Sequence, residues 1–263
     1  GRGTTSIEAA LTGRVPISND INPLSEILAK PRLRPPEMRS IAARLDSLKF
    51  EEGKKAGLDL SMFYHPKTEA EIACLRNYLA QKKEDGTEDE IDSWIRMVAT
   101  NRLTGHSPGF FSVYSLPPNQ AVSQTRQIKI NEKLRQTPEY RDTRAIILKK
   151  SKQLLAKVSP QELLNLQNYG SCALFLCCDA RETVNIQSNS VQLIITSPPF
   201  LDIVQYADDN WLRCWFNNID LPSVASKITA HKKLEDWVSV MQNVFDELYR
   251  IAKPGAYVAF EVG

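Results

Sequence analysis

The chain has 263 residues, of which 42% are hydrophobic and 24% are charged, and this suits one or two globular domains with a substantial core. The net charge of +2 excludes a strongly basic overall field, although a local basic face stays open. The longest apolar runs are too short for a membrane span, and we expect no signal peptide. The five cysteines and three histidines lack metal-ligand spacing, so we expect no metal site and buried, reduced thiols in a cytoplasmic protein.

The first 35 residues alternate between helix and strand. The glycine-rich segment Gly1-Arg2-Gly3-Thr4-Thr5 opens a helix at about residues 6–11, and residues 15–18 form a short strand that ends at Asn19-Asp20. A second helix follows Asn22-Pro23 and stops at the prolines between residues 31 and 36. Because the chain opens inside a glycine-rich turn and closes on a strand, we expect it to be a fragment of a longer reading frame.

A large helical insert is predicted over residues 36–168, because segments rich in Lys, Arg, Glu and Gln dominate there. Its helices are expected at about 37–55, 67–83, 87–101, 123–136 and 141–157. The segment 105–120 contains too many Pro, Gly and Ser residues for a helix, and its aromatic residues predict an ordered loop.

The insert carries two groups of residues with open roles. Nine cations either form a solvated surface or follow nucleic-acid phosphates together: Arg126, Lys129, Lys133, Arg135, Arg141, Arg144, Lys149, Lys150 and Lys152. Six loop residues either reach a base or groove or belong to the core: His106, Ser107, Phe110, Phe111, Tyr114 and Asn119.

The alternation of strands and helices resumes over residues 169–263. Strands are predicted at 172–178, 191–196 and 257–262, and a long amphipathic helix is predicted at 233–251. A further helix contains Trp211, Trp215 and Phe216, whose spacing places them in a helix core. This order of elements predicts an α/β fold with a mostly parallel sheet and helices on both of its faces.

Polar groups follow the predicted strands at their carboxyl ends, where open α/β sheets bind ligands. Asp20 ends one strand and either accepts hydrogen bonds from ribose hydroxyls or caps the next helix. Asp179 ends another strand. The segment Ser197-Pro198-Pro199-Phe200 ends the strand 191–196, because the two prolines lack an N–H and fix φ. Its hydroxyl, free carbonyl and flat ring suit a planar molecule with an amino group.

Several motifs occur together in order: GRGTTSIEAALTGR, NDINPL, VQLIITSPPF and LYRIAKPGAYVAFEVG. Over residues 1–35 and 171–263 they resemble the S-adenosylmethionine-dependent DNA methyltransferases that modify exocyclic amino groups. The resemblance implies a Rossmann-like methyltransferase sheet whose first strand, before Gly1, is missing from this chain. Arg2 in place of a small residue and Phe200 in place of the commoner Tyr depart from the family pattern.

The resemblance also implies a role for each motif. The cofactor would be S-adenosyl-L-methionine, held by Gly1, Gly3, Thr4, Asp20, Asp179 and Ala180. The catalytic residues would be Ser197, Pro198, Pro199 and Phe200, which would hold a base flipped out of double-stranded DNA. The Ser197 hydroxyl and the Pro198 carbonyl would accept both amine hydrogens, which makes the nitrogen more nucleophilic, while the Phe200 ring stacks on the base. Serine at position 197 favours N4 of cytosine over N6 of adenine.

The sequence thus divides into a cofactor-binding part at 1–35, a helical insert for target recognition or a lid at 36–168, and a catalytic part at 169–263. The first interpretation is a site-specific DNA methyltransferase that lies outside the membrane and has a restriction endonuclease as a candidate partner. The alternatives are an RNA amino-methyltransferase and a DNA-binding fragment without catalysis. The recognition sequence and the oligomeric state stay open.

Overall fold

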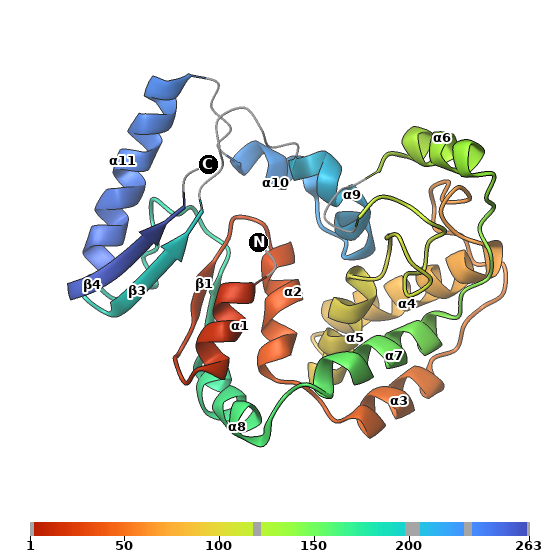
Figure 1. Cartoon of the computed structure of the whole chain (residues 1–263), viewed down its shortest axis with the longest axis horizontal. Coiled ribbons are helices and arrows are strands. Elements are labelled where there is room, and N and C mark those ends of the chain that lie inside the picture. The colour runs from red at the N-terminus through yellow and green to blue at the C-terminus, as the bar shows by residue number, and fades with distance from the viewer. Residues whose placement is uncertain (1–2, 118–121, 198–205, 229–232, 262–263) are drawn as a thin grey trace.

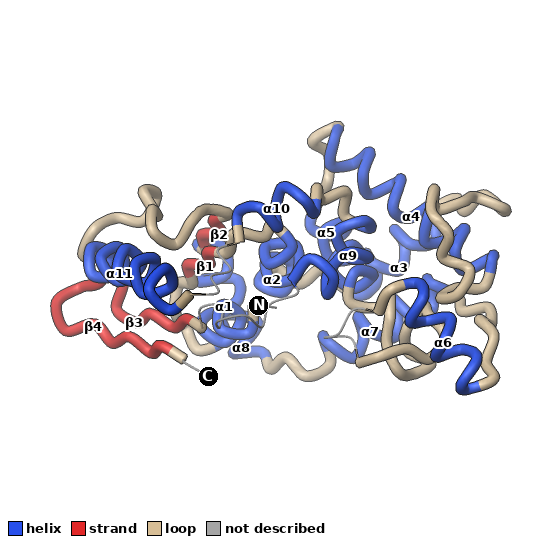
Figure 2. The backbone as a smooth tube through the Cα atoms, turned by 90° about the horizontal axis from the view of Figure 1, so that it is seen from above, coloured by secondary structure: helices blue, strands red, loops and turns tan. Residues whose placement is uncertain are grey.

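The computed structural model of the chain describes residues 3–117, 122–197, 206–228 and 233–261. The described elements form an α/β fold, with two small parallel sheets towards one end and a body of helices towards the other (Figures 1 and 2). Among the described helices, none combines the length and the apolar composition that a bilayer crossing requires.

The first strand pair joins the two ends of the predicted insert. Helix α1 (Thr4–Leu11), strand β1 (Ile17–Asn19) and helix α2 (Leu24–Leu33) follow one another as the sequence predicts. Strand β2 (Leu174–Leu176) pairs in parallel with β1, with Ile17 opposite Leu174 and Asn19 opposite Leu176. Because the two strands are far apart in sequence, their pairing brings the segments on either side of the insert together.

Helix α8 (Pro160–Tyr169) and a short 3-10 helix (Gly170–Cys172) lead into β2. We did not expect α8, although Ser159 and Glu162 form a capping box at its start, with Pro160 in its first turn. Leu166 of α8 packs against Ala10 and Leu33 in a small core beside β2. This core fixes α1 and α2 against the strand pair.

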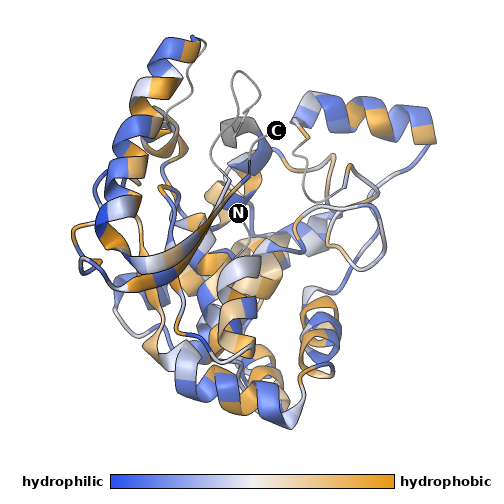
Figure 3. Ribbon diagram, turned by 60° about the vertical axis from the view of Figure 1, so that its left-hand side comes forward, coloured by the Kyte–Doolittle hydropathy of each residue, from blue (hydrophilic) through white to orange (hydrophobic). Residues whose placement is uncertain are grey.

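The second strand pair consists of β3 (Val191–Thr196) and β4 (Ala252–Phe260), which are also parallel. Helix α11 (Leu234–Ile251) covers one face, where the ring of Phe245 lies 4.9 Å from that of Phe260. On β3, which is largely hydrophobic in Figure 3, Leu193 and Ile195 are 47% and 53% exposed. This sheet is therefore covered by described residues mainly on one face.

Strand β4 begins five residues earlier than the sequence predicted, directly after α11. The proline at position 254 is accommodated because the strand register shifts between Val191 and Leu193, and Gly255 adopts a φ of 82°. Such a bulge leaves room for a residue that cannot donate a ladder hydrogen bond.

In space the strands follow the order β4, β3, β1, β2, and both views agree on this order (Figures 1 and 2). The carboxyl ends of β1, β3 and β4 point to the same side of the molecule (Figure 1). Within the described residues, β1 and β3 each pair with one strand, so their other edges face each other without ladder hydrogen bonds.

The helical body contains α3 (Met38–Ser47), α4 (Pro66–Glu84), α5 (Glu90–Thr100), α6 (Gln124–Leu134) and α7 (Thr143–Leu155). Four of the five predicted insert helices are confirmed with small changes at their ends. The helix expected at 37–55 ends at Ser47, because the backbone becomes extended at Leu48, and Gly53, within the expected range, adopts a positive φ of 74°. The largest core of the structure lies between these helices, around Ile72, Leu75 and Ile95.

Helices α9 (Tyr206–Phe216) and α10 (Leu221–Lys227) lie between β3 and β4 in sequence, yet α9 packs into the helical body. Its Phe216 is buried in the largest core with Trp211 packed against it, and Trp211 Nε1 donates to the Val122 carbonyl at 3.2 Å. Asn217 Nδ2 donates to Thr100 Oγ1 at 3.0 Å. The expected core role of the aromatic residues of this helix is confirmed, and the helical core extends beyond residues 36–168.

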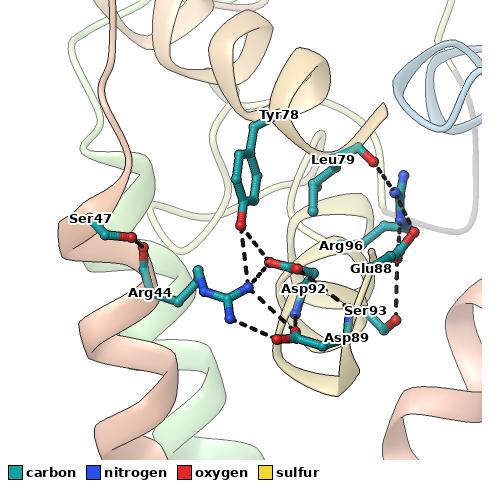
Figure 4. Close-up of polar contacts among 9 residues, drawn as sticks. All are labelled: Arg44, Ser47, Tyr78, Leu79, Glu88, Asp89, Asp92, Ser93 and Arg96. Carbon is teal, nitrogen blue, oxygen red and sulfur yellow. Dashed lines mark hydrogen bonds and ion pairs between the residues drawn. The ribbon is translucent and has the colours of Figure 1, made fainter. Parts of the chain in front are cut away.

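A buried ion network ties α3 to α4 and α5 (Figure 4). Arg44 of α3 bonds to Asp92, and its second nitrogen lies 2.7 Å from Asp89 Oδ2. The Tyr78 hydroxyl donates to Asp92 Oδ1 at 2.8 Å. Arg96 similarly holds Glu88, at 2.8 Å. Buried charges persist in proteins only when they are paired, so these contacts fix how the three helices pack.

The cysteines differ from expectation. All five are free thiols, but Cys214 is the only buried one, since Cys172 and Cys177 are exposed and Cys74 and Cys178 are half-buried. The physical reason is that the β1–β2 pair has little cover on the side of residues 172–178, where the strand is only three residues long.

Candidate active site

The carboxyl edge of the β1–β2 pair brings two predicted cofactor residues together. The backbone N–H of Asp20 donates to the Leu176 carbonyl at 3.2 Å, and the N–H of Cys178 donates to Asn19 Oδ1 at 3.1 Å. Asp20 and Asp179 therefore follow neighbouring parallel strands at the same edge. These contacts are dictated by the register of the two strands, which the sequence alone did not give.

Two thiols lie beside these carboxylates. Partial desolvation and the Asp20 carboxylate raise the pKa of Cys177, although its side chain is largely exposed, and partial burial and the Asp179 carboxylate raise the pKa of Cys178. Both thiols therefore stay protonated at neutral pH, and neither has the character of a nucleophile.

The Asp20 carboxylate holds the start of α2. One oxygen accepts from the Asn22 N–H at 2.9 Å, and the other accepts from the Ser25 hydroxyl. This is the geometry of a helix cap, which is one of the two roles that the sequence left open for Asp20. The other role is to bind ribose hydroxyls.

Asn22 is a polar residue of this site that our reading of the sequence missed. It is 1% exposed, and its Oδ1 accepts from the Leu24 N–H at 2.8 Å, whereas its Nδ2 has no hydrogen-bond partner. A buried amide without a partner costs about 1–3 kcal/mol, which indicates that a polar group belongs beside it. The signal in the sequence was the NDINPL motif, in which we assigned a binding role to Asp20 alone.

Asp179 is half-buried and pairs with Arg181, whose Nε and Nη2 donate to its two oxygens at 2.9 and 2.6 Å. These hydrogen bonds lower the pKa of Asp179 against the opposing effect of burial, so its carboxylate is ionised at neutral pH. Ala180, between the two, is exposed. The ion pair is a local contact across two residues, and a ligand with its own donors could compete with it.

Gly3 and Thr4 begin α1 on the side to which the strands point (Figure 1). Gly3 adopts a φ of 76°, and a side chain there would overlap the Cβ of Ala29 in α2. Glycine is thus required both by its backbone conformation and by the close approach of α1 to α2. Thr4 is exposed, and Gly1 lies outside the described residues.

Ser197 directly follows β3 and is exposed at the same edge. The N–H of Glu261, after β4, donates to the Thr196 carbonyl at 2.9 Å, so the parallel pair is held up to the residue before Ser197. The other three predicted catalytic residues, Pro198, Pro199 and Phe200, lie outside the described residues.

The described loop residues of the insert differ in burial, and Ser107 is half-buried. Phe110 and Phe111 are buried and belong to the core, whereas His106 and Tyr114 are exposed. The loop is ordered, as predicted, over its described part, since Arg141 donates to the carbonyls of three of its residues. Asn119 lies outside the described residues.

Three comparisons, with protein-family models, with curated proteins and with solved structures, found no match to this chain.

Proposed function

We propose that the chain is the cofactor-binding and catalytic part of an S-adenosylmethionine-dependent DNA amino-methyltransferase, acting on cytosine N4 in preference to adenine N6. The observation that carries this proposal is the shared carboxyl edge of parallel strands, with Asp20 and Asp179 on adjacent strands and Ser197 after a third. In open α/β sheets this edge is the usual place for a ligand. The motif resemblance supplies the identity of the ligand.

The proposal includes a Rossmann-like sheet in which a further strand lies between β1 and β3. Two observations support it: the facing edges of these two strands lack ladder partners among the described residues, and both pairs run in the same direction (Figures 1 and 2). Two-stranded sheets are marginal by themselves, whereas one added strand would make a single five-stranded parallel sheet. It would also cover apolar surface near the exposed Leu193 and Ile195.

The polar groups at the β1–β2 edge fit this cofactor. The carboxylates of Asp20 and Asp179 are acceptors for ribose hydroxyls and for an adenine amino group, and the buried Asn22 amide is a donor that lacks a partner. When bound, S-adenosyl-L-methionine supplies an electrophilic methyl group. The task of this chain is to orient the acceptor amine towards it, because most of the rate gain in such a transfer comes from positioning.

At the target base, the Ser197 hydroxyl and the Pro198 carbonyl accept the two amine hydrogens. This draws electron density onto a nitrogen whose lone pair is otherwise delocalised into the ring. The Phe200 ring stacks on the base, an interaction worth about 1–3 kcal/mol. The base must first leave the duplex, because the amine is inaccessible inside it.

The test is calorimetric titration of S-adenosyl-L-methionine into the chain. We expect saturable binding. Asp20→Asn should weaken binding, and Asp46→Asn, on the exposed side of α3, should leave it unchanged. Incubation with DNA or RNA and nucleoside analysis of the product then identify the methylated base. Absence of cofactor binding would refute the proposal, and methylation of RNA alone would favour the RNA methyltransferase.

One observation favours the alternative of a DNA-binding protein without catalysis. Both candidate cofactor carboxylates already have partners, Asp179 in Arg181 and Asp20 in Ser25. If this alternative holds, the chain binds duplex DNA, but calorimetric titration with S-adenosyl-L-methionine shows no heat of binding.

A further inference from the structure

The nine cations of the insert are not equivalent in the structure. Arg141 turns inwards and donates to the carbonyls of Ser107 at 3.2 Å and Phe110 at 2.9 Å. The guanidinium of Arg144 lies 4.1 Å from the ring centre of Phe50 and donates to a backbone carbonyl. These two arginines hold the fold together and are not free to contact a partner.

Three cations on α6 have the opposite arrangement. Arg126, Lys129 and Lys133 occupy positions i, i+3 and i+7, which places them along one face of the helix, and all three are exposed. We call this set the α6 stripe. Among the ion pairs of the described residues, none includes a member of the stripe. Glu132 is the only acidic residue of α6, so the helix surface is net positive.

The opposite face of α6 anchors the helix with polar side chains. The fully buried Gln127 donates to the Tyr114 carbonyl at 3.0 Å, and Asn131 Nδ2 donates to the Met62 carbonyl at 2.8 Å. Gln136, after the helix, donates to the same Tyr114 carbonyl at 2.8 Å. The stripe therefore sits on a helix that is fixed in orientation.

The dimensions of the stripe match a nucleic-acid backbone. At about 1.5 Å per residue, the stripe is about 10 Å long. One strand of a duplex carries a phosphate about every 3.4 Å along the axis, so about three phosphates lie within that length. Helix α6 lies on the side of the molecule to which the strands point, with α9 and α10 between it and the candidate active site (Figure 1).

We propose that the α6 stripe binds the phosphate backbone of duplex DNA and holds the duplex along the side of the molecule that carries the strand ends. This proposal rests on the proposed function for its choice of DNA, and on charge and geometry for the choice of surface. Phosphate contacts fix the register of a protein on the duplex without reading sequence. The α6 stripe thus positions the DNA, and base recognition belongs to other residues.

The test measures duplex affinity against salt concentration for the chain and for a triple variant, Arg126→Gln/Lys129→Gln/Lys133→Gln. Each lost phosphate contact lowers the slope of log K against log salt by about 0.9, so the expected decrease is about 2.7, with on the order of a hundredfold weaker binding at about 0.1 M salt. The matched control removes three exposed lysines elsewhere, Lys49→Gln/Lys55→Gln/Lys83→Gln, and should keep the wild-type slope. Thermal unfolding checks that both variants are folded.

Three results would overturn the inference: an unchanged slope in the triple variant, an equal decrease in the control, or no salt-dependent binding by the wild-type chain. The same test on duplex RNA checks the choice of DNA. If the wild-type chain has the same salt slope on RNA as on DNA, and the triple variant lowers both slopes equally, the assignment to DNA is wrong. The outcome is separable from that of cofactor titration, because a chain that binds no S-adenosyl-L-methionine can still show the stripe-dependent slope, and a methyltransferase can bind DNA through another face.

Discussion

Replacing Arg44 by methionine should strand a buried charge in the helical body. The Asp92 side chain is 0% exposed, and in the variant its carboxylate keeps the Tyr78 hydroxyl but loses the guanidinium that neutralises it (Figure 4). Breaking a buried ion pair in this way costs about 3–5 kcal/mol. The second ion pair, between Arg44 and Asp89, adds less than about 1 kcal/mol, because the Asp89 side chain is 46% exposed to solvent. The expected loss of stability is therefore about 3–5 kcal/mol.

Urea unfolding followed by far-ultraviolet circular dichroism measures this loss. A chain of this size should also unfold roughly 6–20 °C lower, at about 2–4 °C for each kcal/mol. The matched control is Arg39→Met on the same helix, whose side chain is 85% exposed and pairs with Glu37 at the surface. That control should change stability by less than about 0.5 kcal/mol.

A second substitution separates the charge from the packing of the arginine stem. Asp92→Asn in the Arg44→Met background removes the stranded charge and should recover about 1–2 kcal/mol, because the penalty comes mainly from an unpaired carboxylate. A loss below about 1 kcal/mol in Arg44→Met, or no recovery in the double variant, would refute the view that this network is buried and coupled.

Three further results are expected. The hydrogen bonds from Arg250 and Thr183 lower the pKa of Glu247 to about 2 from an ordinary 4.5. The stability that they contribute is therefore complete above about pH 4.5 and is lost as the pH falls towards 2. Unfolding experiments at a series of pH values should show this loss, and Glu247→Gln should abolish this part of the pH dependence. Gly3→Ala should lower the melting temperature more than Gly53→Ala, since both glycines have positive φ but only at position 3 would a methyl group meet another helix; equal losses would mean that α1 does not approach α2 closely. Ser197→Ala should reduce methyl transfer strongly and leave cofactor affinity nearly unchanged, and a parallel loss of cofactor binding would show that this residue was misplaced.

Local patterns in the sequence were sufficient for most of the elements. The helices α4, α5, α6 and α7 follow from composition and spacing, and the strand before Ser197 follows from an apolar run that two prolines must end. The errors arose where local signals conflict. The long helix expected at 37–55 contains a glycine at position 53, and α8 was hidden in a polar segment although its capping box was visible.

The sequence by itself also determined which residues belong at strand ends, because the polar residue after each apolar run can be read directly. Only the tertiary structure decided which of those ends are neighbours, since the pairing of β1 with β2 joins residues more than a hundred positions apart. The same holds for α9, whose aromatic residues are buried by helices from a distant segment, and for the cations of the insert. The spacing of residues along a helix shows which of them share a face of that helix, but the packing of the whole chain decides what the face contacts. Arg141 thus meets a backbone carbonyl, whereas Lys129 meets solvent.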